Sequence, residues 1–165
     1  MTSVSLPGKP RRLTDLQKIL LAWVVGFTLA GAYAAGRYVP AAGWTTSDVT
    51  TGASAGYPDL QPRVYDSSVE NTTVLAAAVA SRLPRWKVAE KKADPHTVTC
   101  TVAEPIGFLI DDVEIHIEPA GPDQRASRVV IHSHSRRGGG DLGENARHIR
   151  ALQAAMDDRL PLLIP

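Results

Sequence analysis

The chain has 165 residues, which is room for one folded domain of ordinary size, since typical domains have about 100 to 150 residues. Its 18 Lys and Arg residues stand against 17 Asp and Glu residues, and the net charge of +1 excludes the strong basic field that holds nucleic acid by its phosphates. The single cysteine, Cys100, excludes an internal disulfide and a zinc site made of this chain's own thiolates.

An uncharged run of 18 residues from Ile19 to Gly36 predicts a single transmembrane helix, which we place at residues 19–38. Helical residues rise about 1.5 Å each, so the run spans about 27 Å, close to the roughly 30 Å apolar core of a bilayer. Amphipathic rings favour the headgroup region. Four such rings lie toward the ends of the run or just beyond it, on Trp23, Tyr33, Tyr38 and Trp44.

The charges that flank this run predict its orientation. Four basic residues precede it and only Arg37 follows closely, so the positive-inside rule places residues 1–18 in the cytoplasm. The rest of the chain is then expected on the periplasmic side of a bacterial inner membrane. The preceding basic residues are Lys9, Arg11, Arg12 and Lys18.

A cleavable secretory signal is the alternative interpretation of the same segment. A basic start, an apolar run and the small-residue pattern Ala32-Tyr33-Ala34 are typical of such signals. However, the run is longer than the apolar part of an ordinary signal, which has about 7 to 15 residues. The sequence therefore favours an uncleaved anchor and leaves cleavage open.

Small residues recur every four positions along the predicted helix, at Ala22, Gly26, Ala30 and Ala34. Such a stripe lets two helix backbones approach closely in lipid, where dispersion contacts drive helix association. It predicts a partner helix, either in a membrane complex or in a second copy of this chain. The alternative is that Ala and Gly are simply common in membrane helices.

Residues 39–56 are rich in Gly, Ala, Ser and Thr, and this composition predicts a flexible linker. The folded domain is then expected at residues 57–165, beginning at the stiff segment Tyr57–Pro62.

Hydrophobic periodicity predicts the elements of this domain. Apolar residues at helical spacing over Ser68–Leu83, followed by Pro84, predict a first helix. Period-two alternation predicts three strands, at Thr97–Ala103, Leu109–Glu118 and Arg128–Ser135, with a shorter fourth at Arg85–Glu90. The side chains expected to face the core are Val98, Cys100, Val102, Val113, Ile115, Ile117, Val129, Ile131 and Ser133.

The remaining segments predict how these strands connect and how the chain ends. The Ala-Gly-Pro-Asp sequence within residues 119–127 indicates a hairpin. Asp141 and Glu144 have the spacing of a capping box and predict a second helix through Leu160. The apolar tail after Leu160 either packs back on the domain, which is favoured, or docks on a partner. The predicted fold class is α+β, with an antiparallel sheet of three to four strands and two helices on one face.

A set of polar residues and glycines runs in a definite order along the domain, and we expect its members to have structural roles. They are Asp111, Asp112, Ser135, Arg136, Gly138, Asp141, Gly143, Asn145 and Arg147, together with the segments Tyr57–Pro62 and Arg85–Val88. This set resembles the pattern of domain of unknown function 1499, an uncharacterised family of bacteria and plastids, over roughly Tyr57 to Leu152.

The resemblance implies no reaction, because the family has no assigned activity. Two positions depart from the family pattern: His132 stands where an arginine is typical, and His148 where another basic residue is usual.

One candidate site lies on the outward face of the predicted hairpin. If Val113 pairs with Ser133, then Asp112 lies opposite His134 and Glu114 lies opposite His132. Imidazoles and carboxylates are suitable ligands for a divalent metal such as zinc. The same arrangement is also ordinary cross-strand charge pairing, which is the favoured interpretation. The sequence therefore predicts no resident metal or cofactor.

A second candidate site is the loop Gly138–Gly140, which leads into the predicted helix near Arg136, Arg137 and Arg147. Backbone N–H groups at a helix N-terminus bind anions such as lipid headgroups. However, Asp141 and Glu144 are expected to cap that helix themselves and so repel a second anion. The favoured interpretation is structural, with Arg136 bonded to Asp111 or Asp112 and Asn145 tying the loop to the sheet.

No catalytic constellation emerges from these patterns, because Ser133 and Ser135 alternate along a strand without the sharp turn that presents a nucleophile. The sequence therefore favours a non-enzymatic, single-pass accessory or assembly subunit of a membrane complex. The alternative is a periplasmic domain that binds a ligand or metal, with or without catalysis, behind a cleaved or uncleaved signal. The expected partners are the lipid bilayer and another transmembrane helix, without nucleic acid.

Overall fold

A computed structural model describes residues 13–38, 40–89, 94–104 and 109–164. The chain forms two compact units, the first of which ends at Tyr38. Most of the predicted cytoplasmic segment, including Lys9, Arg11 and Arg12, lies outside the described residues, as does Glu90 at the end of the predicted fourth strand.

The first unit contains a single long helix, α1, at Asp15–Tyr38. Its segment Asp15–Tyr33 has a mean hydropathy of 1.4 and is 0% buried within the chain. The helix is therefore long and apolar enough to cross a membrane, as the uncharged run predicts. It begins four residues before the predicted span, and Lys18 in its first turn bonds to Asp15.

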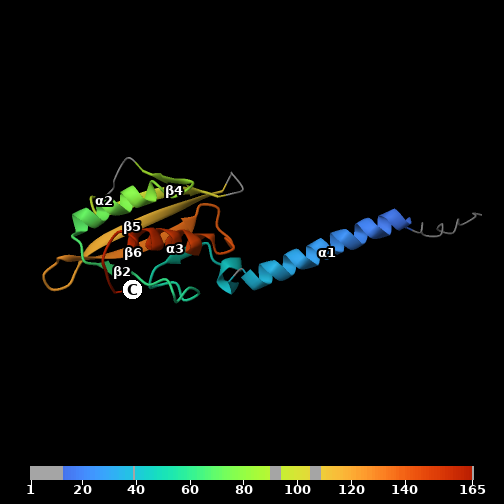
Figure 1. The fold of residues 1–165 in the computed structure, drawn as a ribbon, viewed down its shortest axis with the longest axis horizontal. Coiled ribbons are helices and arrows are strands. Elements are labelled where there is room, and N and C mark those ends of the chain that lie inside the picture. The colour runs from blue at the N-terminus through green and yellow to red at the C-terminus, as the bar shows by residue number, and fades with distance from the viewer. Residues whose placement is uncertain (1–12, 39, 90–93, 105–108, 165) are drawn as a thin grey trace, which may run out of the picture. The chain divides into compact units, whose positions relative to one another are not determined.

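The second unit is built on an antiparallel sheet of seven strands, which run in the order β3-β4-β5-β6-β2-β7, with β1 also paired to β6 (Figure 1). Strands β1 and β2 follow the same edge of β6, because β1 pairs with residues 132–134 and β2 with residues 127–129. The strands are β1 (Asp48–Thr50), β2 (Arg63–Tyr65), β3 (Trp86–Val88), β4 (Thr97–Ala103), β5 (Ile110–Ala120), β6 (Ala126–Ser135) and β7 (Leu162–Ile164).

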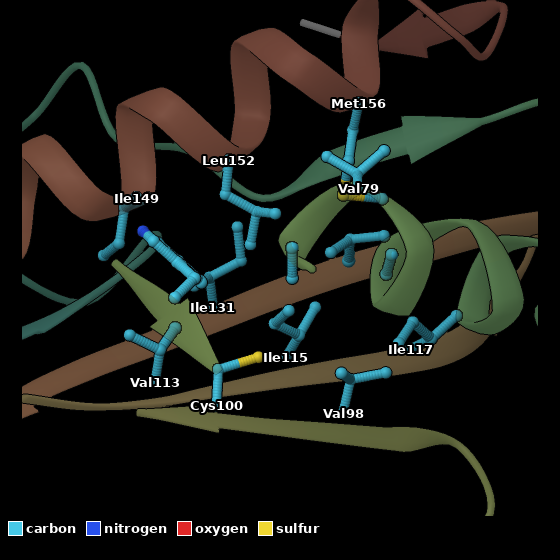
Figure 2. Close-up of a cluster of buried hydrophobic side chains, with 14 of the residues drawn as sticks. Val79, Val98, Cys100, Val113, Ile115, Ile117, Ile131, Ile149, Leu152 and Met156 are labelled. Atoms are coloured by element: carbon cyan, nitrogen blue, oxygen red, sulfur yellow. The ribbon is translucent and has the colours of Figure 1, made fainter. Parts of the chain in front are cut away.

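Two helices, α2 (Val69–Ala80) and α3 (Glu144–Asp157), cover one face of this sheet. Ser68 caps α2 by accepting a hydrogen bond from the N–H of Asn71. Leu152 from α3 points toward Ile131 and Ile115 on the sheet, and Val79 from α2 belongs to the same buried cluster (Figure 2). The domain core therefore lies between the helices and the sheet, and the predicted α+β class with both helices on one face is confirmed.

The longest strands and their register agree with the sequence prediction. β4 has the predicted bounds, and Val113 pairs with Ser133 as expected. Burying one face of each strand produces the period-two pattern from which these strands were predicted. All the side chains expected to face the core are buried, namely Val98, Cys100, Val102, Val113, Ile115, Ile117, Val129, Ile131 and Ser133.

The predicted strand number is too low, because β1, β2 and β7 were not expected. Each has three residues, which is too short for a visible alternation of apolar and polar side chains. β7 pairs with β2, so the apolar tail packs back on the domain, as the favoured alternative predicts.

The prediction of a flexible linker at residues 39–56 is also wrong, because this segment contains two regular elements. Ala41–Trp44 forms a short 3₁₀ helix, η1, and Asp48–Thr50 adds β1 to the sheet. Val49 is 0% exposed. Small residues are needed here for close packing, because a Cβ on Gly43 would lie 2.6 Å from the backbone nitrogen of Gly143. The composition that suggested flexibility thus reflects a tightly packed segment.

Candidate functional site

A pocket of about 520 Å³ opens where β4, β5 and β6 meet the loop that leads into α3. Glu104, which follows β4, and Asp111 of β5 line it from the sheet, together with Ser135 at the end of β6. Arg137 from the loop and Arg147 from α3 line it from the other side. The pocket therefore combines acidic groups of the sheet with basic groups of the loop and helix.

Three buried ionisable side chains meet at this pocket. Glu104, Asp111 and His148 are 8%, 2% and 5% exposed. The Nε2 atom of His148 lies 3.2 Å from Oε1 of Glu104, and its Nδ1 atom lies 3.5 Å from Oδ2 of Asp111. The ring of Trp86 packs edge-on against His148, with 5.9 Å between the ring centroids. We call these three residues the acid–histidine cluster.

Strand alternation explains how two acids come to lie on the core side. Glu104 lies two residues after Val102, just beyond the end of β4, and so continues the inward series Val98, Cys100 and Val102. Asp111 begins the corresponding series on β5 and pairs with Val102 and with Ser135 on the neighbouring strands.

The position of His148 follows in the same way from the periodicity of helix α3. His148 lies beside Ile149 on the face of α3 that is buried against the sheet. The sequence reasoning overlooked Glu104 altogether and considered His148 only as a departure from the family pattern. Following the strand alternation to its ends would have pointed to Glu104, because an acid in the inward series is unusual.

Hydrogen bonding within the acid–histidine cluster is incomplete. Among the described residues, Oε1 of Glu104, Oδ2 of Asp111 and both ring nitrogens of His148 are buried without a hydrogen-bond partner. Buried polar atoms without partners are rare in proteins, and each costs about 1–3 kcal/mol. Four of them in one cluster therefore make this position a candidate functional site.

Burial shifts two of these groups toward their uncharged forms. Burial, and after it the adjacent Asp111 carboxylate, raises the pKa of Glu104 to about 8. Burial also lowers the pKa of His148, although the charge of Asp111 opposes this shift. Burial therefore favours the uncharged forms of both side chains.

Asn145 organises the loop beside the pocket, as predicted. It is 0% exposed, and its Oδ1 accepts a hydrogen bond of 2.6 Å from Oγ of Ser133. Its Nδ2 donates to Oγ of Ser135, to the carbonyl oxygen of Ser47 and to the Asp141 carboxylate. One side chain thus links the segment before β1, strand β6 and the start of α3.

The predicted capping box is wrong in its register. The N-cap of α3 is Gly143, at φ +83°, and Glu144 is the first helical residue. The Asp141 carboxylate still accepts hydrogen bonds of 2.8 Å from the N–H groups of Gly143 and Asn145. Glu144 does not complete the box, because its carboxylate pairs with Arg147 at 2.6 Å.

The glycine loop borders the pocket, as its position before α3 suggests. Gly138 and Gly140 line the pocket, and Gly138 has φ +68°. Gly140 lies directly against the backbone carbonyl of Trp44, so that any Cβ would overlap it. These glycines therefore meet backbone requirements, and anion binding at the loop remains a prediction.

The outward-facing candidates come together as the register predicts, but in ion pairs. Arg136 donates two hydrogen bonds, of 2.7 and 2.8 Å, to the Asp112 carboxylate. His132 bonds to Asp48 of β1 at 3.0 Å, and its ring stacks on that of His134. Glu114 pairs with His132 in backbone register. Metal binding by this face stays a prediction, and the only grouping of three potential ligands found among the described residues is the acid–histidine cluster.

The small-residue stripe lies on the helix of the first unit. Ala22, Gly26 and Ala30 are exposed on α1, and nothing lies within 4 Å of a Cβ built on Gly26. The side chain of Ala34 lies outside the described residues. The stripe is thus open to a partner, which remains a prediction.

Comparison with known proteins places the chain in a family without assigning a reaction. No curated protein matches the chain. Among solved structures, a START superfamily protein from Mycobacterium smegmatis is similar, with 14% sequence identity and a TM-score of 0.39, covering 68% of this chain and 96% of that one. The model of a family described as "protein of unknown function (DUF1499)" matches residues 29–156. The chain therefore belongs to the DUF1499 family, as its motifs indicated.

Proposed function

We propose that this protein is a single-pass membrane protein that serves as a non-enzymatic accessory or assembly subunit of a membrane protein complex. The observation that carries the proposal is the exposure of the apolar side chains of α1. Trp23 is 63% exposed and Phe27 is 71% exposed, although both are large and apolar. Side chains of this kind need lipid or another helix around them.

The composition of α1 favours association with a partner helix over simple anchoring. Ala22, Gly26 and Ala30 leave room for a second backbone at close range, and close packing is the main source of helix affinity in lipid. The partner is either a helix of another subunit or a second copy of α1.

The charge distribution supports a cytoplasmic N-terminus and a periplasmic domain at a bacterial inner membrane. Lys18 precedes the apolar segment, and further basic residues precede Lys18 in the sequence. The positive-inside rule favours this orientation for a short N-terminal segment.

Extraction of native membranes with a mild detergent tests the proposal. After native gel separation, mass spectrometry identifies the N-terminal peptide and every co-migrating protein. We expect the intact N-terminus in a complex of fixed composition. The double variant Gly26→Leu and Ala30→Leu should no longer migrate with that complex, because the larger leucine side chains hold the two helices apart.

A matched control places the same bulk elsewhere on the same helix. Gly31→Leu with Ala32→Leu makes the same two changes of residue type, about a third of a turn to either side of the stripe, and should leave the complex intact. Equal behaviour of the two double variants would rule out the stripe as the contact. A chain that migrates alone and lacks its N-terminal segment would overturn the proposal in favour of a cleaved signal.

The pocket favours a second candidate function, namely that the folded domain binds a ligand. Its volume of about 520 Å³ falls within the range of small-molecule sites, which is about 300–1,000 Å³. Ionisable side chains that are buried and shifted in pKa, as Glu104 and His148 are, cluster at functional sites more than elsewhere.

A further inference from the structure

We propose that Glu104, Asp111 and His148 bind one divalent transition-metal ion of the zinc type, with an open coordination position that faces the pocket. This inference makes the ligand-binding candidate specific and rests on it. It is independent of the membrane-subunit proposal, because all three residues belong to the folded domain.

The donor atoms are the first argument. Two carboxylates and one imidazole are ligands that zinc and related ions take, commonly as three protein ligands with a fourth position left for water or substrate. One donor atom from each of the three side chains can be chosen so that all lie within 4.8 Å of one another. Tetrahedral zinc with bonds of about 2.0–2.2 Å holds its ligand atoms about 3.3–3.6 Å apart. Nε2 of His148 and Oε1 of Glu104 lie 3.2 Å apart, which is close to that spacing. Asp111 faces the other ring nitrogen, Nδ1, at 3.5 Å, so the three donor atoms together meet only the wider limit of 4.8 Å.

The unpartnered atoms are the second and independent argument. Each of the three side chains is more than nine-tenths buried, and each has a polar atom without a hydrogen-bond partner among the described residues. Two of the unpartnered atoms are carboxyl oxygens, which can bind a cation or accept a hydrogen bond. A metal ion would bond to oxygens of both acids and to one nitrogen of His148, leaving the other nitrogen for an outer partner.

Access to the pocket is the third argument. Glu104 and Asp111 line the pocket, so an ion held by them can keep a coordination position open to it. Ser135 and Arg137 line the same space and are placed to contact a water or an anionic group on the ion. The exposed face of the hairpin offers no comparable carboxylate at Asp112, because Asp112 is already paired with Arg136.

A rival explanation is a protonated His148 that bridges the two carboxylates without any metal. A protonated ring would donate from both nitrogens, and it faces an acid on each side. This rival predicts no saturable binding of Zn²⁺ at the cluster.

Calorimetric titration of the full chain in detergent separates the two explanations. The protein is stripped with a chelator and titrated with Zn²⁺ in a non-chelating buffer at about pH 7.5, where free imidazole is largely neutral. We expect one high-affinity ion per chain. Glu104→Gln and Asp111→Asn should each weaken binding at least about tenfold, since each replaces a charged ligand by an amide.

The control removes histidines that the proposal does not use. His132→Gln with His134→Gln deletes the stacked pair on the outer face and should keep the wild-type affinity. Added Zn²⁺ should raise the Tm of the wild type and of this control, but not that of Glu104→Gln. Both amide variants keep the size of the original side chain, so each should fold normally by circular dichroism.

Two outcomes would overturn the site. One is a wild type that binds Zn²⁺ no more tightly than Glu104→Gln, which would support the bridging histidine. The other is binding that disappears in the His132 and His134 double variant, which would move the metal to the outer face. Neither outcome affects co-migration with a membrane complex, so failure of the metal site and failure of the subunit proposal are distinguishable.

Discussion

The ion pair between Arg136 and Asp112 decides whether the Asp112 carboxylate is free to bind a ligand, which the sequence alone leaves open. The guanidinium of Arg136 bonds to both carboxylate oxygens of Asp112, and this hydrogen bonding lowers the pKa of the Asp112 carboxyl. The charge of nearby His134 lowers it further to a smaller extent. The pair therefore holds Asp112 ionised and unavailable as a free ligand.

Replacing Arg136 by Gln should raise the pKa of Asp112 toward the ordinary aspartate value of about 3.9. Because the folded-state pKa of Asp112 lies below its unfolded value, the stabilisation is present above about pH 4 and is lost as the pH falls through the folded-state value. Arg136 is largely exposed, so the loss in unfolding free energy near pH 7 should be only about 0.2–1 kcal/mol. An NMR titration of the Asp112 carboxyl and urea unfolding measure the two quantities.

Arg128→Gln is the matched control, since it breaks the exposed pair with Glu118 elsewhere on the same hairpin. It should leave the pKa of Asp112 unchanged. An unchanged Asp112 pKa in Arg136→Gln would instead mean that His134 or solvent structure controls this carboxyl.

The burial of a residue could be predicted from the sequence where the residue followed the apolar alternation of its strand. It was missed where an acidic residue took an inward position. Cys100 and Ser133 were predicted to be buried because they continue apolar alternation, and both are. Glu104 continues the same alternation just beyond β4, but an acid on an inward position contradicts the usual burial preference. Its partner His148 is distant in sequence, so only the folded chain shows that the two lie 3.2 Å apart.

At the scale of elements, Asn145 adds side-chain hydrogen bonds between three segments that backbone hydrogen bonds also join. Its hydrogen bonds join β6, the segment before β1 and the loop that enters α3. All of them are made by a side chain that is 0% exposed. Losing this side chain leaves several buried polar groups without partners at once.

Asn145→Ala should therefore lower the free energy of unfolding by about 2–3 kcal/mol, the cost typical of unsatisfied buried groups. The segment that includes β1 should also exchange its amide protons faster, because the bond to the carbonyl oxygen of Ser47 is lost. Urea unfolding and hydrogen exchange measure these effects.

Asn71→Ala provides the comparison, because Asn71 is exposed on the first turn of α2. That substitution should change stability by no more than about 0.5 kcal/mol. Equal effects of the two variants would show that Asn145 does not organise the loop.

The elements that sequence reasoning missed share one physical cause. β1, β2 and β7 gain their stability by pairing with neighbouring strands, and three residues carry too little pattern to reveal that pairing. Residues 39–56 were misread for a related reason. Glycine and alanine indicate flexibility when solvated, but close packing around Gly43 and Gly140 requires the same residues.

At the scale of the whole molecule, the chain combines an exposed apolar helix with a folded domain that buries its own apolar side chains. The domain buries the apolar side chains of its sheet and helices, whereas α1 is 0% buried over its apolar segment. The sequence could predict this division, because an uncharged run of this length depends on no tertiary contact. The side of the membrane on which the domain lies depends on flanking charge, and it can be measured directly.

Thiol labelling in bacterial spheroplasts should establish that orientation, because the natural chain provides an unreactive background. Cys100 is 0% exposed, and burial raises the pKa of its thiol to about 12, so a membrane-impermeant maleimide should leave the folded wild type unlabelled. Ala78→Cys on the exposed side of α2 should then be labelled in intact spheroplasts. Ser3→Cys, in the segment before the apolar run, should be labelled only after the membrane is permeabilised.

The two cysteine variants control for each other, since each shows that the reagent reaches one side of the membrane. The reversed pattern would place the domain in the cytoplasm and contradict the positive-inside prediction. Loss of the Ser3→Cys label even from permeabilised spheroplasts, with Ala78→Cys still labelled, would indicate cleavage of the N-terminal segment. Ala78 is exposed and does not line the pocket, and Ser3 belongs to the other unit, so this experiment tests the membrane arrangement without disturbing the proposed metal site.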